Sequence, residues 1–225
     1  MSGVLQGALT AGLEVIDRLP GASNATFLAR GGDTLLIYKP TAGVRPLWDF
    51  EASTLATRET LAFEVSEMMN LGVVPETAEA VGPMGPGAVQ AFVEADPASQ
   101  IAATDHRLWA IAALDLVLNN ADRKAGHILV AGDRVMGVDH GLTFHPEPKL
   151  RTVLWGFAGI SLPLELVAAV ERLLAAFDGG FGAEMAHRLD EAASRSLRLR
   201  VEEVLEHPVH PDPPTDRSAV PWPPY

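Results

Sequence analysis

Side chains of the kinds that handle phosphate and metal ions are concentrated between residues 115 and 144. The segment 120–127, NADRKAGH, is followed by the segment 138–142, VDHGL. Two short apolar runs joined by a Gly-Asp turn lie between them and predict a β-hairpin, which returns Asp139 close to His127, with Asp122 one loop away. Carboxylates gathered in this way suit a hard cation such as Mg²⁺. An ordinary solvated turn is the alternative interpretation.

Phosphoryl transfer is a chemistry that uses such parts together. It requires a carboxylate that orients or deprotonates the acceptor hydroxyl, oxygen ligands for Mg²⁺, and a lysine held against the phosphates. Lys39 ends an apolar run just before Pro40, and Glu59 flanks the apolar face of a predicted helix. These two residues can supply the lysine and its acidic partner, although a lone lysine at such a position is more often a surface residue.

The hydrophobic pattern indicates which elements position these residues. Short apolar runs separated by turn residues predict a β-meander with strands at 13–19, 26–29, 34–38, 77–81 and 88–93. Helical periodicity predicts helices at 54–70, about 104–118, 161–178 and 182–206.

This order of elements predicts an α+β fold with two lobes. The β-rich N-terminal lobe with one helix comprises residues 1–94, and the mainly helical C-terminal lobe comprises residues 95–206. The tail, residues 207–225, contains seven of the 17 prolines. We expect this tail to be mobile because it is too rich in proline to form regular structure.

Composition narrows the classes of function. The chain of 225 residues contains no cysteine, which excludes disulfides, thiolate metal sites and cysteine nucleophiles. Its net charge of −12 disfavours nucleic acid and anionic membrane surfaces as partners. The sequence has no signal-peptide pattern and no apolar run near the ~20 residues that span a bilayer, so we expect a cytoplasmic protein without integral membrane association. Neither GxxxxGK[ST] nor GxGxxG follows a predicted strand.

The chain resembles type II phosphatidylinositol 4-kinases and their bacterial relatives over about residues 21–157. Residues 115–130 and 137–144 look like the catalytic loop and the metal-binding motif of that family. The other matching stretches are similar to its helix C, the strand after it and the interlobe hinge: 58–66, 71–77 and 87–94. The chain also resembles an actinobacterial branch of phosphatidylinositol 3- and 4-kinase-like proteins. The resemblance implies a two-lobed atypical protein-kinase-like fold with an ATP cleft between the lobes.

The resemblance implies a role for the central candidates. Asp122 would be the catalytic aspartate and Asp139 the principal Mg²⁺ ligand. Lys39, paired with Glu59, would be the lysine that binds the phosphates of ATP. The transfer would be from the γ-phosphate of ATP to a hydroxyl acceptor: a protein Ser or Thr, a small polyol or a lipid headgroup. The absence of cysteine removes the palmitoylated insert of type II lipid kinases and favours a soluble acceptor.

Two further regions are implied to contact ATP. The hinge-like stretch with Gln90, Phe92 and Val93 would hold adenine through backbone groups. The turn that contains Ser23 and Asn24 would lie over the phosphates and donate backbone N–H groups to them. For this turn an ordinary hairpin is an equally good interpretation.

Basic residues near the catalytic loop suggest an anionic acceptor. Arg123 and Lys124 follow the catalytic aspartate and could neutralise charge on the acceptor or on the transferring phosphoryl group. Lys149 and Arg151 lie shortly after the metal motif and could complete a local basic pocket in this acidic protein. A solvated turn is the alternative for the first pair.

His127 departs from the pattern of the family, because kinases of this group place an asparagine there as a second metal ligand. Imidazole is a weak ligand for Mg²⁺, so this histidine is compatible with Mn²⁺, with a single-metal mechanism or with an impaired pseudokinase that only binds nucleotide. A metal-dependent hydrolase stays open as another class, with His140 and His145 joining His127, Asp139 and Asp122 as ligands. No HExxH motif supports it.

Overall fold

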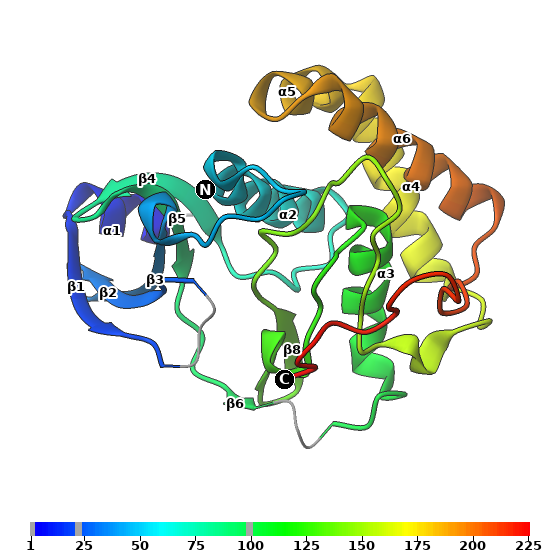
Figure 1. Ribbon diagram of the computed structural model, residues 1–225, viewed down its shortest axis with the longest axis horizontal. Helices are drawn as coiled ribbons and strands as arrows, with labels where there is room; N and C mark the ends of the chain where they lie inside the picture. Colours follow the sequence, from blue (N-terminus) through cyan, green and yellow to red (C-terminus); the bar gives the residue numbers. More distant parts are fainter. Residues whose placement is uncertain (1–2, 21–23, 98–100) are drawn as a thin grey trace.

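The computed structural model describes residues 3–20, 24–97 and 101–225. Figure 1 shows a sheet-containing part formed by the N-terminal half of the chain beside a helical part formed by the C-terminal half. The sheet has five antiparallel strands in the order β1-β2-β3-β5-β4. The strands are β1 (Leu13–Arg18), β2 (Phe27–Gly31), β3 (Thr34–Pro40), β4 (Thr77–Gly82) and β5 (Gly85–Ala91). All five predicted strands are therefore confirmed, with ends that shift by up to three residues.

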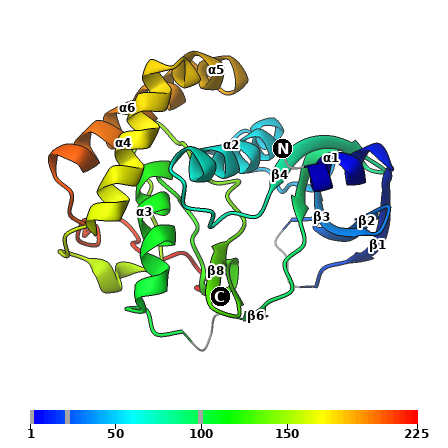
Figure 2. The same cartoon turned by 180° about the vertical axis from the view of Figure 1, so that it is seen from behind.

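A short helix that the sequence pattern did not reveal, α1 (Gly3–Thr10), covers one face of this sheet (Figure 2). Leu5 and Ala8 of α1 pack against Leu36 and other buried residues of the sheet. The helix approaches β2 so closely that a Cβ atom on Gly31 would lie 2.3 Å from the carbonyl oxygen of Ala8. Only glycine allows this contact, since any side chain would collide with the backbone.

The helix α2 (Leu55–Met68) lies between the two parts and confirms the predicted helix. It packs against β4 and β5 on one side and against α4 (Leu164–Asp178) on the other. Because both sides are covered, polar residues such as Arg58 and Glu59 are buried on it along with Leu61 and Val65. This helix therefore carries side chains from the sheet to the C-terminal part.

The C-terminal part is built around α3 (Trp109–Leu118), whose apolar side chains form the centre of the largest core cluster. A three-stranded sheet of β6 (Asp96–Pro97), β7 (Ile128–Ala131) and β8 (Arg134–Gly137) lies next to it, with β7 and β8 forming the predicted hairpin. The helices α4, α5 (Phe181–Arg188) and α6 (Glu191–Glu206) complete this part. Single-turn 3₁₀ helices flank these elements: 41–43, 52–54, 106–108, 125–127 and 155–157.

The predicted helix at 182–206 is divided in two. Leu189 leaves the helical conformation, and Asp190 begins α6 by accepting a hydrogen bond from the backbone N–H of Ala193 at 2.7 Å. An aspartate in this position satisfies one of the free N–H groups of a helix start. The hydrophobic periodicity continues across the break, which is why the sequence pattern did not show it.

The proline-rich tail, 207–225, lies against the body of the protein, and its expected mobility stays a prediction. Its carbonyl groups accept hydrogen bonds from the body of the protein: His210 from Gly159, and Ala219 from both Thr152 and the indole of Trp155. Pro224 accepts another from Ala125, in the loop between α3 and β7, at 2.9 Å. Proline removes a donor but keeps its carbonyl, so a proline-rich segment can still bind where the partner supplies the N–H groups.

Within the described residues, no helix combines the length and the apolar character that crossing a membrane requires.

Candidate functional site

Lys39 lies at the end of β3 and joins two carboxylates from distant parts of the chain. Its Nζ lies 2.5 Å from Oε1 of Glu59 and 3.0 Å from Oδ1 of Asp139. Side chains alternate along a strand, so Lys39 points away from the face where Leu36 and Tyr38 pack under α1. Burial favours the neutral amine, but the charges of Asp139 and Glu59 outweigh it and raise the pKa of Lys39.

Glu59 is buried on α2 and holds two elements at once. One oxygen accepts from Lys39, and Oε2 accepts from the backbone N–H of His140 at 3.0 Å. Burial raises the pKa of this carboxyl, while the charge of Lys39 opposes that shift. A second contact of α2 with the same loop comes from Arg58, which donates to the carbonyl of Thr143. The helix is thus fixed to the loop that follows β8.

Asp139 closely follows β8 and has a left-handed backbone, with φ of 63°. Aspartate is one of the few residues that adopt this conformation readily. Its second oxygen, Oδ2, lies 3.2 Å from Nε2 of His127, and about half of its side-chain surface is exposed. Partial desolvation by itself raises the pKa of Asp139, but the charge of Lys39 and the neighbouring His127 lower it strongly. The carboxylate is therefore ionised and still accessible.

Asp122 and Lys124 lie in the loop after α3 and contact each other. The backbone N–H of Asp122 donates to Oδ1 of Asn120 at 3.0 Å, and its carboxylate lies 3.2 Å from Nζ of Lys124. The side chain of Asp122 is 23% exposed, whereas Lys124 is buried. A carboxylate held in this way can accept a proton from a group that approaches from solvent.

Arg123 does not face an acceptor, which corrects our prediction that it neutralises substrate charge. Its side chain is fully buried and donates from Nε and Nη2 to the two oxygens of Asp115, at 2.8 Å each. It also donates to the carbonyls of His127 and Val138 at 3.2 and 2.7 Å. Arg123 instead joins α3, the loop that follows α3 and the end of β8, and it holds these segments in position.

Asp115 is the residue that the sequence reasoning left without a role. It is a carboxylate within an otherwise apolar helix segment, ALDLVL, and it is 1% exposed. Besides Arg123 it receives a hydrogen bond from Nδ2 of Asn120 at 2.8 Å. A lone acid inside an apolar helix requires a buried partner, because a buried charge without one is very costly. A single acid in an apolar helix was therefore the sequence signal from which a buried partner for Asp115 could have been inferred.

His127 contacts Asp139 rather than standing apart as an independent ligand. Burial lowers the pKa of its imidazole, so the ring is neutral at pH 7, and Nε2–H is the tautomer that can donate to Asp139. Its Nδ1 is buried and has no hydrogen-bond partner within the described ranges. The same ranges contain no group of three or more His, Asp or Glu side chains placed to hold one metal ion.

The histidines proposed for a hydrolase point to other partners. Nε2 of His140 lies 2.7 Å from the guanidinium of Arg123, and the ring is fully buried. Burial and the charge of Arg123 lower the pKa of His140 well below its usual value. His145 packs edge-on against Phe50, with ring centres 5.3 Å apart, and accepts from the N–H of Glu147. This arrangement gives the metal-dependent hydrolase no support.

The hinge-like stretch is engaged in the sheet. The side chain of Gln90 is buried and donates to Oγ1 of Thr77 at 2.8 Å, so it is not presented to a ligand. The N–H of Phe92 donates to the carbonyl of Leu35 at 3.2 Å, so this one group is engaged within the protein, and adenine binding by other backbone groups near Phe92 stays a prediction. Val93 is half-buried and stays a prediction.

The turn predicted to cover the phosphates is described only in part. Ser23 lies outside the described residues. Oδ1 of Asn24 accepts from the backbone N–H of Arg45 at 3.0 Å, and its carbonyl accepts from Oγ1 of Thr26 at 3.4 Å. Asn24 thus fixes the local chain, and a role toward phosphate stays a prediction.

The predicted basic pocket is not assembled. Lys149 forms an ion pair with Asp49 at 3.0 Å and lies over the ring of Trp48, 4.6 Å from its centre. Arg151 donates from Nε to the carbonyl of Ala121 at 2.7 Å. With Arg123 buried as well, these cations hold the loops together instead of facing a shared acceptor.

Comparisons with known proteins agree with this arrangement at the level of fold. No protein-family model matches the chain. The structure of the Helicobacter pylori proinflammatory kinase CtkA superposes with a TM-score of 0.51 and 13% identity, over 88% of this chain and 93% of that one. The chain thus has an α+β protein-kinase-like fold, with a β-rich N-terminal sheet and a helical C-terminal part, as the sequence predicted.

A relative with much higher identity comes from Mycobacterium tuberculosis. Protein Rv2133c of strain H37Rv is 37% identical over 257 aligned positions, which cover 95% of this chain and 92% of the relative. Similarity of this extent includes both parts of the fold. The chain belongs to the family of Protein Rv2133c.

Proposed function

We propose that this protein is an ATP-dependent phosphotransferase, an atypical kinase similar to the phosphatidylinositol kinases, which transfers the γ-phosphoryl group to a hydroxyl acceptor. The observation that carries the proposal is the contact of Lys39 with both Glu59 and Asp139. These three residues come from β3, α2 and the loop after β8, and phosphoryl transfer in kinases requires a lysine–glutamate pair next to a metal-binding aspartate. The kinase-like fold supports the same class of reaction.

In this mechanism Lys39 binds the phosphates of ATP and Glu59 holds its ammonium group in place. Mg²⁺, when bound with ATP, supplies positive charge to the phosphate oxygens. Asp139 would hold this ion, and the exposed, ionised carboxylate of Asp139 fits a hard cation that prefers oxygen ligands. His127 fits the role of an orienting partner of Asp139, because its Nε2 already lies against Oδ2.

Asp122 would orient the acceptor hydroxyl and accept its proton. Its carboxylate is partly exposed, and Lys124 lies 3.2 Å away. Lys124 would stabilise the negative charge that develops on the phosphoryl group during transfer. The geometry is compatible with a protein Ser or Thr, a small polyol or a lipid headgroup as acceptor.

A nucleotide-binding module without catalysis is a second candidate, and one observation favours it. By the resemblance, His127 stands where the related kinases have an asparagine as second metal ligand, and its Nε2 lies 3.2 Å from Oδ2 of Asp139. An imidazole there binds Mg²⁺ weakly and Mn²⁺ better. A chain that binds ATP through Lys39 and transfers no phosphate would fit this candidate.

The decisive experiment measures ATP binding and phosphate transfer on the purified protein with Mg²⁺ and with Mn²⁺. We expect isothermal titration calorimetry to show that ATP binds. We also expect the labelled γ-phosphate to be transferred to the protein itself or to an acceptor in a panel that includes phosphatidylinositol. Asp122→Ala should keep ATP binding and lose transfer, whereas Asp139→Ala should weaken metal-dependent binding. Full transfer activity in either variant would contradict the assignment, and binding without transfer by the wild type would indicate the second candidate.

A further inference from the structure

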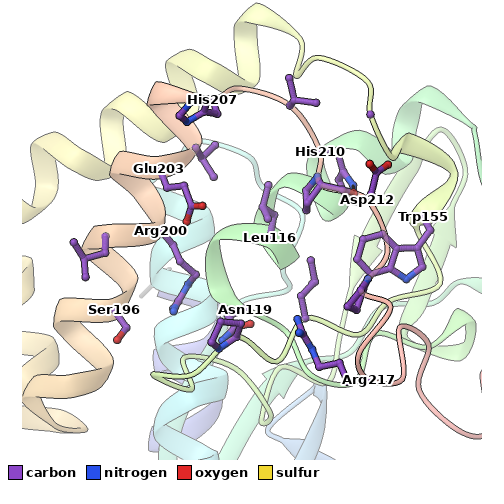
Figure 3. Close-up of a pocket in the computed structure, with 18 of the residues that line it drawn as sticks. Leu116, Asn119, Trp155, Ser196, Arg200, Glu203, His207, His210, Asp212 and Arg217 are labelled. Atoms are coloured by element: carbon purple, nitrogen blue, oxygen red, sulfur yellow. Dashed lines mark hydrogen bonds between the residues drawn. The ribbon is translucent and has the colours of Figure 1, made fainter.

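A cavity of about 590 Å³ lies away from Lys39 and Asp139, where α6, the C-terminal end of α3 and the tail meet (Figure 3). Cavities of this volume are typical of sites that bind small molecules. Much of the wall is apolar and includes Leu116, Leu150, Trp155 and Val204. In Figure 3 Trp155 lies across the cavity from α6, which carries Arg200. The proposed phosphotransfer reaction uses none of these five residues.

Arg200 is the exceptional residue of this wall. Its Nε donates to the carbonyl of Val117 at 2.9 Å, and Nη1 donates to the carbonyl of His145 at 3.3 Å. Nη2 is buried and has no hydrogen-bond partner in the part of the chain that the structure describes. Nearly all buried donors in proteins are paired, so an unpaired nitrogen on a guanidinium indicates a missing acceptor.

The charge of Arg200 is also incompletely matched. Burial lowers its pKa to about 10, and Glu203, the acid that opposes this shift, forms no hydrogen bond with Nη2 in the described residues. Arg198, two positions earlier on the same helix, shows the contrast: its guanidinium lies 2.9 Å from Glu202 and 3.2 Å from Asp178. Arg200 is still positively charged at neutral pH and is only partly exposed. The wall also carries the acids Glu203 and Asp212, and within the described residues neither forms an ion pair with the Arg200 guanidinium.

We propose that this cavity is a binding site for a small amphipathic anion, whose carboxylate or phosphate group contacts Arg200 while its apolar body lies between Trp155, Leu116 and Val204. The anion would supply the acceptor that Nη2 lacks and the negative charge that the guanidinium lacks. Apolar walls with few polar groups are the usual construction of a ligand site. The proposal is independent of the phosphotransferase activity.

The test uses the full chain and two simple probes, octanoate and octyl phosphate, below their micelle-forming concentrations. Calorimetry should show one molecule bound per chain, and binding should change the fluorescence of Trp155, because the indole lines the cavity. Octanol lacks the anionic group and inorganic phosphate lacks the apolar body. Each should therefore bind at least about tenfold more weakly than the anionic probes, which corresponds to the loss of one good interaction. The tighter of the two anionic probes identifies the preferred headgroup.

Variants connect this binding to Arg200. Arg200→Met should weaken binding of the anionic probes by at least about tenfold, while Arg198→Met on the same helix should leave it unchanged. If Arg200→Met does not fold, Ser196→Trp provides the second test, because a large side chain at this wall position fills the cavity and keeps the charge. Octanol binding as tightly as octanoate, or anion binding that survives a folded Arg200→Met or Ser196→Trp variant, would overturn the proposal.

Discussion

Glu59 accepts a hydrogen bond from the backbone N–H of His140 at 3.0 Å while its other oxygen holds Lys39. One carboxylate on α2 therefore fixes both a side chain of the sheet and the backbone of the loop that presents Asp139. A displacement of α2 would disturb Lys39 and Asp139 together, the two groups proposed to contact phosphate and metal. This arrangement makes the position of one helix decisive for the whole candidate site.

Replacing Glu59 with glutamine should reduce both stability and ATP binding. The amide removes one of the two carboxylates opposite Lys39 and leaves Asp139 as the remaining charged partner, which should lower the free energy of unfolding by about 1–3 kcal/mol. ATP affinity should fall by about tenfold, because Lys39 is no longer held toward the phosphates. Urea unfolding and calorimetry measure the two effects. Glu67→Gln, on the exposed side of α2, is the matched control and should change neither.

Replacing Arg123 with methionine should destabilise the fold strongly. The change leaves the buried carboxylate of Asp115 without its cation and the carbonyl of Val138 without its donor. Breaking a buried ion pair from one side costs about 3–5 kcal/mol. Arg195→Met, at an exposed position of α6, should stay within about 0.5 kcal/mol of the wild type. Equal unfolding curves for the two variants would refute the positioning role.

A second change should recover part of that loss. In the double variant Arg123→Met, Asp115→Asn the buried carboxylate is replaced by a neutral amide, so no uncompensated charge remains. We expect the double variant to unfold at a higher urea concentration than Arg123→Met alone. Additive losses would mean that Asp115 and Arg123 do not act as a pair.

Replacing His127 with asparagine should change the metal preference of the proposed reaction. The amide oxygen is a better ligand for Mg²⁺ than an imidazole, so the ratio of the rate with Mg²⁺ to the rate with Mn²⁺ should rise severalfold, by about 1 kcal/mol of relative stabilisation. Steady-state transfer rates with each ion measure this ratio. The same change at the exposed His106 should leave the ratio of the two rates unchanged. An unchanged ratio of the two rates in His127→Asn would show that this histidine does not influence which metal ion the reaction prefers.

His210 should make the fold sensitive to acid. Its ring is 1% exposed and lies among Trp109, Trp155 and Phe157, and burial lowers its pKa below 6.5. The unfolded chain therefore binds a proton near pH 6.5 that the folded chain binds only at lower pH. Stability is complete above this range and decreases as the pH falls through it, by no more than about 1.4 kcal/mol per pH unit from this group.

Substitution isolates that effect. Chemical unfolding between pH 7.5 and about pH 5 should show a shallower loss for His210→Phe than for the wild type, because the variant has no ring to protonate. His207→Phe, at an exposed position of the same tail, should leave the slope at its wild-type value. A steeper loss in His210→Phe would contradict the assigned direction.

The sequence predicted the elements that depend on local pattern. The periodicity of α2 indicated that Glu59 can face the sheet, and the resemblance to the kinase motifs implied its pairing with Lys39. The predicted hairpin brought Asp139 close to His127. The contact of Lys39 with Asp139, 100 residues away, was not predicted.

Other features depend on where a side chain points or on which distant backbone it meets. The side chain of Arg123 points inward because it pairs with Asp115 on α3. The distance between these two residues in the sequence does not predict that the pair is buried. Packing of α1 depends on the absence of a side chain at Gly31. The tail follows the donors of the loops it crosses, such as Thr152. Such features come from tertiary contacts, which outweigh local preference.

Asp122 and Arg123 are neighbours in the chain, and they will be confused in any screen that scores only loss of activity. Under the proposed function we expect substitution of either one to yield an inactive protein, the first because a group that meets the acceptor is gone and the second because the loop around it no longer forms. Soluble yield should separate the two positions: we expect Asp122 variants to accumulate as folded protein and Arg123 variants to be lost to aggregation and proteolysis. A map of tolerated substitutions in this family therefore requires abundance and activity to be recorded side by side.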